Sequence, residues 1–502
     1  MSAASGVLMT ARERVDAIVK AYDVRGRSPQ TFDPSLAFVL GAAFAEETQI
    51  SGRRGCAVVG RDMRESSPAI AAAIIDGITA VGGDVVDLGL ASTDLLYFAS
   101  GTWELPGVMV TASHNPAGYN GLKFCRAGAR PVGRDSGLAA IADGAVRMLD
   151  DPGDPGDAQD ERGDERGTVT ERSALEDYAA RLVELVPLAS GVRTRPLRVV
   201  VDAANAMAGH VVPSVFAHLD VELVPLYFEL DGRFPNHDAN PLEPANLVDL
   251  QAAVTAHRAD LGLAFDGDAD RCFVVDEGGA LVTPSAITSL IALRYLAKQP
   301  GATILHNVIC SRAVPEIIAE AGGVPIRTPV GHSLIKAEMA RTGAVFGGEH
   351  SGHFYFADFF LADTGMLAAL HVLAALAETT SPLSALMSRY ERYVASGEIN
   401  RSVDDADAVM SAVEHATGRA DGVVVDHMDG LTVSHPDWWF NLRSSQTEPL
   451  LHLNVEAQDD GAMHDIRDEV LAMIDRLSRG DAPTPPAPTT LTAPTGRPLD
   501  ES

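Results

Sequence analysis

Short apolar runs alternate with helical patterns along most of this chain, and that alternation limits its fold more narrowly than any other feature. Cys56–Gly60 is typical of a buried strand. We expect a helix after it, with Ser67 as the N-cap and Pro68 in the first turn. The next strands are expected at Asp84–Leu88 and Gly107–Val110. This order of elements predicts a layered α/β fold.

The same order of elements returns twice, which predicts three related α/β units. The further strands are expected at Leu197–Val201, Glu222–Leu226, Asp260–Phe265, Thr303–His306 and Ala344–Phe346, with a helix at Ala313–Ala321. A final, smaller α+β unit ends in an amphipathic helix whose apolar stripe includes Ile466, Val470, Met473, Ile474 and Leu477. We therefore expect domains at residues 1–157, 168–276, 277–388 and 389–478, and a disordered tail at 479–502.

Acidic residues outnumber basic ones by 69 to 39, so the net charge is −30. A chain this acidic is a poor candidate for binding nucleic acid or an anionic membrane surface. Eight of the acids lie between Asp150 and Glu165, in a segment rich in Pro and Gly. We expect an exposed linker there and a domain boundary near residue 168. A metal site in this segment is disfavoured because no apolar core would hold its carboxylates in place.

Nothing in the sequence predicts a disulfide framework or a membrane segment. The four cysteines lack CxxC spacing and are expected to be free thiols: Cys56, Cys125, Cys272 and Cys310. Met1–Arg14 lacks the apolar core of a signal peptide. Ala286–Ala297 and Met366–Ala377 are about a dozen residues long, too short to cross a bilayer, and are expected to be core helices. We therefore expect a cytoplasmic protein without membrane association.

Ser113 follows the expected strand Gly107–Val110 within the sequence TASHNP. Ligands bind at strand ends of open α/β sheets, so Ser113 could act as a nucleophile or a phosphate carrier. The alternative is an ordinary turn in which Ser and Asn bond their own backbone. The segment is not a GxSxG elbow, which disfavours hydrolase chemistry of that type.

Three carboxylates alternate after the strand Asp260–Phe265: Asp266, Asp268 and Asp270. A curled chain could bring them onto one hard cation, and carboxylate ligands suit Mg²⁺ or Ca²⁺ rather than zinc. An EF-hand is disfavoured, because Arg271 stands where that loop needs Gly and Cys272–Asp276 is strand-like. A plain acidic turn remains an alternative, although three such close carboxylates repel each other unless a cation lies among them.

Two further loops carry polar groups. Glu349, Ser351 and His353 lie among glycines and suit hydrogen bonds to several hydroxyls; a flexible turn is the alternative. Arg443 precedes hydroxyl and amide side chains that suit an anion cradle, and a polar hairpin loop is the alternative there. Basic residues also occur in YDVRG, at Arg25, and in GHSLIK, at Lys336. Alone, each of these is an ordinary solvated charge.

Together these motifs resemble those of the α-D-phosphohexomutases, a family that includes phosphomannomutase, phosphoglucomutase and phosphoglucosamine mutase. They occur in the family's order from Tyr22 to Pro449: YDVRG, GRDMRESSP, TASHNP, YNGLK, DGDADR, GHSLIK, GEHSGH and RSSQTEP. DGDADR and GEHSGH make the chain most similar to bacterial phosphomannomutases. Gln446 departs from the family's usual Asn or Gly but still offers an amide.

The resemblance implies four domains around a central cleft and a phosphorylated Ser113 that exchanges its phosphoryl group with a hexose phosphate through a hexose 1,6-bisphosphate. It implies one Mg²⁺ per chain, held by Asp266, Asp268, Asp270 and a phosphoserine oxygen. Further positive charge would come from Arg25, Lys123, Arg271 and Lys336, and the acid/base would be Lys123 or His114. The remaining substrate contacts would come from Tyr22, Glu349, Ser351, His353, Arg443, Ser445, Gln446 and Thr447.

The expected function is interconversion of mannose 6-phosphate and mannose 1-phosphate, with phosphoglucomutase or dual activity as the alternative. A phosphoglucosamine mutase and a non-catalytic phosphosugar-binding relative are further alternatives. The last is disfavoured because Ser113 and all three Asp residues are present. A phosphatase is disfavoured because no feature indicates a water-activating base, and a Ca²⁺-binding structural protein because of Arg271. The sequence leaves monomer and homodimer open. We expect Arg25, Lys123, Arg271, Lys336 and Arg443 to converge on one cleft.

Overall fold

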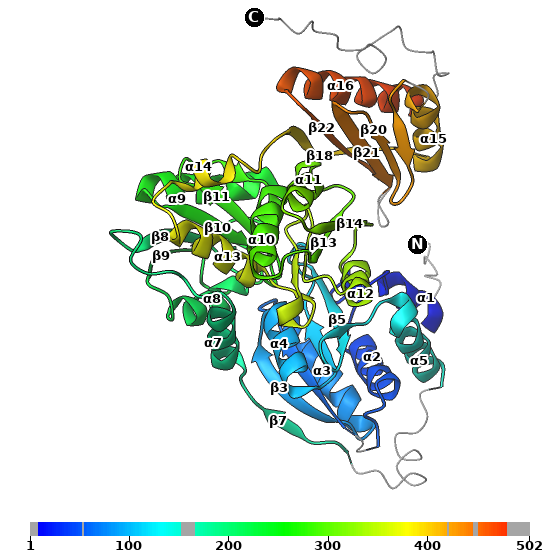
Figure 1. Cartoon of the computed structure of the whole chain (residues 1–502). Coiled ribbons are helices and arrows are strands. Elements are labelled where there is room, and N and C mark those ends of the chain that lie inside the picture. Colours follow the sequence, from blue (N-terminus) through cyan, green and yellow to red (C-terminus); the bar gives the residue numbers. More distant parts are fainter. Residues whose placement is uncertain (1–8, 53–54, 152–165, 419–420, 445–449, 479–502) are drawn as a thin grey trace, which may run out of the picture.

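A computed structural model of the chain describes residues 9–52, 55–151, 166–418, 421–444 and 450–478. Most of the expected acidic linker and the whole expected disordered tail lie outside these residues. The described part forms four units, each built on its own sheet (Figure 1). The expected fold of three related α/β units and a smaller α+β unit is confirmed.

The first unit has a seven-stranded sheet in the order β1-β5-β4-β2-β3-β7, with β6 paired to β5. Its strands are β1 Val24–Arg27, β2 Cys56–Arg61, β3 Asp84–Leu90, β4 Gly107–Val110, β5 Tyr119–Arg126, β6 Arg130–Pro131 and β7 Val169–Glu171. Its helices are α1 Ala11–Ile18, α2 Pro34–Glu47, α3 Ser67–Ala80, α4 Thr93–Trp103 and α5 Leu138–Asp150, with a 3-10 turn at Arg134–Ser136. Helices α1, α2, α3 and α5 share one apolar core with one face of this sheet, whereas α4 packs on the other face, in a core shared with the next two units.

The second and third units repeat this topology. The second contains α7 Leu175–Leu185, β8 Leu197–Asp202, α8 Ala208–Phe216, β9 Val221–Leu226, α9 Val248–His257, β10 Leu261–Phe265, β11 Cys272–Asp276 and β12 Leu281–Val282. The third contains α10 Pro284–Lys298, β13 Thr303–Asn307, α11 Ala313–Glu320, β14 Val324–Thr328, α12 His332–Thr342, β15 Phe346–Gly348, β16 Phe354–Phe356, β17 Ala362–Asp363, α13 Gly365–Ala377 and α14 Leu383–Met387. In each of the three units a central strand, β2, β8 or β13, has a parallel neighbour on either side. One of these neighbours, β4, β10 or β15, also pairs with the antiparallel strand that follows it in the chain.

The fourth unit is an antiparallel sheet in the order β18-β22-β21-β20-β19 with two helices against it. Its elements are β18 Val394–Ser402, α15 Ala406–Thr417, β19 Val424–Asp426, β20 Leu431–Ser434, β21 Trp438–Ser444, β22 Leu450–Ala457 and α16 Asp460–Leu477. The expected amphipathic helix is confirmed, since Ile466, Val470, Met473 and Ile474 are buried. This unit, orange to red, lies at the opposite end of the molecule from α2 and α3 (Figure 1).

The structure corrects three local expectations. Ser66, not Ser67, is at the N-cap of α3, and the hydroxyl of Ser67 instead donates to Asp62 at 2.5 Å. The chain does not leave the first sheet near residue 168, because β7 pairs with β3. Its side chains are exposed, so no apolar pattern marks this edge strand. The strand expected at Ala344–Phe346 begins only at Phe346 and ends at Gly348.

The two most apolar helices lie in the interior, as expected. Helix α10 and helix α13 are almost entirely buried, and both contribute to the core that joins the first three units. Among the described residues, no helix is both long enough and apolar enough to span a membrane.

Candidate functional site

An acidic loop between β10 and the antiparallel strand β11 forms the centre of the site. The carboxyl groups of Asp266, Asp268 and Asp270 are buried, and one oxygen of each lies within 4.8 Å of the others. Burial and the charges of Asp270 and Asp268 raise the pKa of Asp266 well above its usual value. The Oδ1 atoms of Asp268 and Asp270 accept no hydrogen bond from any described residue. These buried, unsatisfied oxygens fit a hard cation, so the triad could hold a metal.

Ser113 faces this acidic loop from the end of β4. Its hydroxyl donates to Asp266 Oδ2 at 2.7 Å, and its backbone has a φ of 50°. The Oγ1 of Thr111 accepts from the amide of Ser113 at 3.0 Å and supports this unusual turn. A Cβ on Gly267 would lie 2.2 Å from the Ser113 carbonyl oxygen, so only glycine permits this contact between the two loops.

Arg64 holds the Ser113 loop in place, and sequence reasoning assigned it no role. Its guanidinium donates to the carbonyl oxygens of Ser113 (2.7 Å), Asn115 (2.6 Å), Pro116 (2.8 Å) and Tyr119 (3.0 Å). Its Nε also donates to Asp62 at 3.1 Å, and the side chain is fully buried. The sequence signal for Arg64 was its place in the motif GRDMRESSP. Local spacing could not reveal its partners, because the carbonyl groups that it binds lie about fifty residues away in the chain.

Two basic side chains, Lys123 and Arg271, contact the carboxylates of the acidic loop. Lys123 on β5 lies between Asp268 Oδ2 (2.6 Å) and Asp270 Oδ2 (2.5 Å). Burial opposes its charge, but the two carboxylates outweigh burial and raise the pKa of Lys123 well above its usual value. The Nε of Arg271 lies 3.2 Å from Asp266, and its Nη2 donates to the Ser113 hydroxyl at 3.4 Å.

Arg25 contacts the loop that carries Ser113, and His114 is the next residue of that loop. Arg25 on β1 donates to Asn115 Oδ1 at 2.6 Å and pairs with Asp23 at 2.7 Å. His114 Nδ1 lies 3.3 Å from the Ser113 hydroxyl and accepts a hydrogen bond from Arg271. Burial and the charges of Arg271 and Arg25 lower the pKa of His114 well below its usual value. The imidazole is therefore neutral at physiological pH.

The loop after β15 brings Glu349, Ser351 and His353 to the edge of the acidic loop. His353 Nε2 lies 3.6 Å from Asp270 Oδ1, and its Nδ1 lies 3.0 Å from the Ser351 hydroxyl. The Glu349 carboxylate is 2 % exposed and accepts from Tyr355 (2.7 Å), the side chain of Asn307 (3.2 Å) and the amide of Gly331 (3.2 Å). Sequence reasoning did not anticipate this buried support for Glu349.

The structure does not present Lys336 as an open positive charge, contrary to expectation. Its ammonium lies 2.6 Å from Asp363 and 4.0 Å from the centre of the Tyr97 ring, and its side chain is 1 % exposed. Asp363 also lies 3.9 Å from His353, so Lys336 sits behind the loop that carries His353. Lys336 is the fifth residue of α12, and nothing in the local sequence indicated that its side chain points inward.

The fourth unit meets the same loop through Glu398 of β18, and Arg443 lies beside Glu398 within that unit. The Nη2 of Arg443 lies 3.8 Å from Glu398 Oε2, and Glu398 also lies 3.7 Å from His350 of the loop after β15. Ser445, Gln446 and Thr447 lie outside the described residues. Tyr22 lies beside Gly331, since a Cβ there would be 3.0 Å from its hydroxyl. Lys123 and Arg271 therefore lie at the acidic loop, Arg25 lies at the Ser113 loop, and Arg443 lies beside Glu398, which contacts the loop that carries His353.

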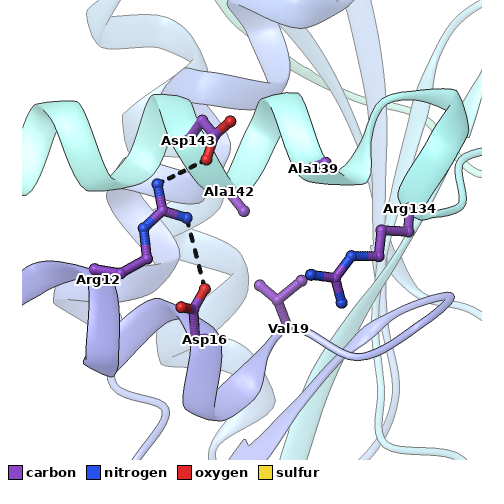
Figure 2. A pocket seen from close by; sticks show the side chains of 7 residues that line it. All are labelled: Arg12, Asp16, Val19, Arg134, Ala139, Ala142 and Asp143. Carbon is purple, nitrogen blue, oxygen red and sulfur yellow. Dashed lines mark hydrogen bonds and ion pairs between the residues drawn. The ribbon is translucent and has the colours of Figure 1, made fainter.

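A separate cavity of about 260 Å³ lies in the first unit between α1 and α5, and none of the residues above lines it. Figure 2 shows Arg12 reaching from α1 to Asp143 on α5. Arg12 pairs with Asp143 at 2.7 Å and with Asp16 at 3.6 Å, so its charge is already balanced by two carboxylates. This cavity is not part of the candidate site.

Comparison with known proteins identifies the four units. The four domain descriptions of phosphoglucomutase/phosphomannomutase match in order: alpha/beta/alpha domain I at residues 16–145, domain II at 176–279, domain III at 283–393 and the C-terminal domain at 398–473. "Phosphohexose mutases" of Xanthomonas campestris is 39% identical over 90% of this chain and 98% of its own. "Phosphomannomutase" of Escherichia coli is 38% identical over 91% and 98%.

A solved structure shows the same arrangement. The crystal structure of a phosphoglucomutase/phosphomannomutase family protein from Burkholderia thailandensis superposes with a TM-score of 0.81 and 34% identity. The match covers 95% of this chain and 100% of that chain. With all four domains matched in order and relatives covered almost completely, this chain is a phosphohexomutase of the phosphoglucomutase/phosphomannomutase family.

Proposed function

We propose that this enzyme interconverts mannose 6-phosphate and mannose 1-phosphate, with Ser113 as the carrier of the phosphoryl group. The observation that carries the proposal is the Ser113 hydroxyl, which lies 2.7 Å from Asp266 of the acidic loop. Phosphoryl transfer depends mainly on positioning and on neutralisation of charge. A hydroxyl placed between buried carboxylates, Lys123 and Arg271 meets both needs once a cation is present.

Asp266, Asp268 and Asp270 are proposed to hold one Mg²⁺, with an oxygen of the phosphorylated Ser113 completing the set. The unsatisfied Oδ1 atoms of Asp268 and Asp270 support this assignment. When bound, the ion neutralises charge on the transferring phosphoryl group.

In the proposed reaction, the bond between phosphorus and the Ser113 oxygen breaks while a bond to a free hydroxyl of the hexose phosphate forms. The hydroxyl gives up its proton, and the Ser113 oxygen takes one. The resulting hexose 1,6-bisphosphate turns over, and its other phosphoryl group returns to Ser113. Lys123 and His114 are the candidates for the group that moves these protons, because His114 lies beside the Ser113 hydroxyl and Lys123 beside the acidic loop.

Substrate binding is proposed to divide between two loops. Glu349, Ser351 and His353 would contact the sugar hydroxyls, and Arg443 would grip the phosphate that is not transferred, together with Ser445, Gln446 and Thr447. Tyr22 would contribute near Gly331. Lys336 would act through Asp363 and the His353 loop rather than through direct contact. Because this phosphate-binding loop belongs to the fourth unit, it could hold the phosphate at either end of the sugar while the bisphosphate reorients.

Phosphoglucomutase activity is the second candidate. The relative from Xanthomonas campestris carries the broader name "Phosphohexose mutases". Mannose and glucose differ only in the orientation of one hydroxyl, which a sugar loop distinguishes by a small difference in binding free energy.

The test is a comparison of kcat/KM for mannose 1-phosphate, glucose 1-phosphate and glucosamine 1-phosphate. We expect the highest value for mannose 1-phosphate and the lowest for glucosamine 1-phosphate. The Ser113→Ala variant serves as the control and should turn over at below about one-thousandth of the wild-type rate. Full activity of that variant would refute the phosphoserine mechanism, whereas preference for glucose 1-phosphate would replace the mannose assignment.

A further inference from the structure

We propose that Thr93 is a positioning residue that holds the Asp268 carboxylate in the orientation that leaves one of its oxygens free for the metal. Thr93 belongs to the first unit, at the first residue of α4, whereas Asp268 lies in the acidic loop of the second unit. The inference rests on the magnesium assignment proposed above.

The two oxygens of Asp268 have opposite surroundings. Oδ2 accepts from the Thr93 hydroxyl at 2.6 Å and from the Lys123 ammonium at 2.6 Å. Oδ1 is buried and accepts from no described residue. The Asp268 carboxylate can rotate only by losing both hydrogen bonds to Oδ2. Water would not replace these bonds, because the side chain is buried. Thr93 and Lys123 therefore leave Oδ1 as the oxygen available to a cation.

Lys123 alone does not fix this orientation. Its ammonium is shared between Asp268 Oδ2 and Asp270 Oδ2, at 2.6 Å and 2.5 Å, so it could follow a movement of either carboxylate. The Thr93 hydroxyl has Asp268 as its acceptor and sits on a rigid helix. Its backbone amide also donates to the carbonyl oxygen of Asp268 at 3.0 Å. Thr93 thus holds both the side chain and the main chain of Asp268.

The first turn of α4 is itself fixed by the neighbouring units. Asp94 accepts from the hydroxyls of Tyr178 on α7 and of Thr364, the N-cap of α13, each at 2.6 Å. Helix α13 in turn packs on the acidic loop, since a Cβ on Gly365 would lie 2.6 Å from the backbone of Arg271. The acidic loop is therefore held between the N-termini of two helices, α4 and α13, that Asp94 links together.

The experiment measures Mg²⁺ binding directly, by calorimetric titration of the full-length protein with Ser113 phosphorylated. Thr93→Val keeps the shape of the side chain and removes the hydroxyl, whereas Thr93→Ser keeps the hydroxyl. Loss of a hydrogen bond that orients a metal ligand weakens metal binding by about ten- to a hundredfold. We expect that loss for Thr93→Val and a dissociation constant within about twofold of wild type for Thr93→Ser.

A second control separates positioning from general damage to α4. Ser92→Ala removes the N-cap hydroxyl, which accepts from the amide of Leu95 at 3.3 Å, donates to Asp94 at 2.5 Å and does not contact Asp268. It should lower the unfolding temperature and leave Mg²⁺ affinity near wild type. Kinetics gives an independent readout: Thr93→Val should need about tenfold more Mg²⁺ for half-maximal rate, and kcat at saturating Mg²⁺ should largely recover.

Three results would overturn the inference, and they are distinguishable. Wild-type affinity in Thr93→Val would show that the hydroxyl does not orient Asp268. Equal losses in Ser92→Ala and Thr93→Val would show a general effect of the helix. A wild-type protein that binds no Mg²⁺ would refute the proposed metal assignment and this inference with it. If Thr93→Val does not fold, the Thr93→Ala variant takes its place, with the same expected loss.

Discussion

Single buried side chains hold the loops of this site in place, and Arg64 makes the most such contacts with the Ser113 loop. It donates to the carbonyl oxygen of Ser113 and to those of three residues that follow Ser113 in the chain. The bond to the Ser113 carbonyl oxygen is buried, and a buried carbonyl left without a donor has a large cost in free energy. Arg64 thus keeps Ser113 in its left-handed conformation and aimed at Asp266.

The Arg64→Lys variant tests this role. A lysine keeps the charge beside Asp62 but cannot reach four carbonyl oxygens with a planar fork. We expect a loss of about 2 kcal/mol in the free energy of unfolding and a fall of about ten- to a hundredfold in kcat. Denaturant titration and steady-state kinetics check both. Arg27→Lys is the matched control, because Arg27 is exposed near the same loop; an equal effect of both substitutions would contradict the assignment.

At the scale of elements, the first turn of α4 joins three units, and one buried carboxylate lies at the junction. Asp94 accepts hydrogen bonds from Ser92, Tyr178 and Thr364. Burial outweighs these hydrogen bonds and raises the pKa of Asp94 to about 6. The junction between the units therefore contains a group that changes charge in mildly acidic solution.

This pKa predicts a pH dependence of stability with a definite sign. Between about pH 4 and pH 6 the folded protein holds a proton on Asp94 that the unfolded chain has released. The contribution of Asp94 to the free energy of unfolding therefore falls as pH rises through this window, by about 3 kcal/mol for a shift of about two units.

Denaturant titrations of wild type and Asp94→Asn at pH 4, 5 and 6 measure the effect. The free energy of unfolding of wild type, relative to the variant, should fall across this range. Thr255→Ala, at an exposed position without a titratable group, provides the control and should show a nearly constant difference. A constant difference for Asp94→Asn as well would contradict the raised pKa.

At the scale of the whole molecule, the fourth unit is attached to the third by hydrogen bonds to main-chain carbonyls. Arg312, beside α11, donates to the carbonyl oxygens of Pro436 (2.5 Å), His435 (2.7 Å) and Trp438 (3.3 Å). Its own amide donates to Glu456 at 3.0 Å. Because Arg443 lies on the same sheet as these carbonyls, Arg312 fixes the position of the proposed phosphate cradle.

Loss of this attachment should weaken substrate binding. Hydrogen bonds to a charged group contribute about 1.5 kcal/mol or more, which corresponds to about tenfold in affinity. We expect Arg312→Ala to raise KM for the phosphosugar about tenfold with a smaller change in kcat. Steady-state kinetics measures the two constants separately. Arg401→Ala is the control, because Arg401 of β18 pairs with Asp475 of α16 within the fourth unit; an unchanged KM in Arg312→Ala would show that the attachment does not matter for binding.

The whole-molecule charge of −30 coexists with a cluster of basic side chains around Ser113, each paired with nearby carboxylates. Arg25, Lys123 and Arg271 come from strands β1 and β5 and from the acidic loop, and they meet because β1 pairs with β5. Eight acids lie in the segment from Asp150 to Glu165, apart from the site in the sequence. A strongly acidic chain can therefore offer a dianionic substrate a basic site.

Local sequence patterns were enough to predict much of the fold. Apolar runs between turn signals predicted the central strands, and β4 lies at Gly107–Val110 as expected. Apolar spacing predicted the stripe of α16. The exposed strand β7 could not be predicted, because its three residues carry no apolar pattern and pair with β3 only through the backbone. Such pairing depends on where the rest of the sheet ends.

The sequence by itself determined the chemistry that the chain can offer: a serine at a strand end, three alternating carboxylates and loops of sugar-binding character in a fixed order. Only the tertiary structure decided how these groups are held. Arg64 and Ser113, Thr93 and Asp268, and Lys336 and Asp363 are far apart in the chain, and no local pattern pairs them. Their pairing follows from burial, because a polar group removed from water must find its partner among whatever side chains the packed units bring beside it.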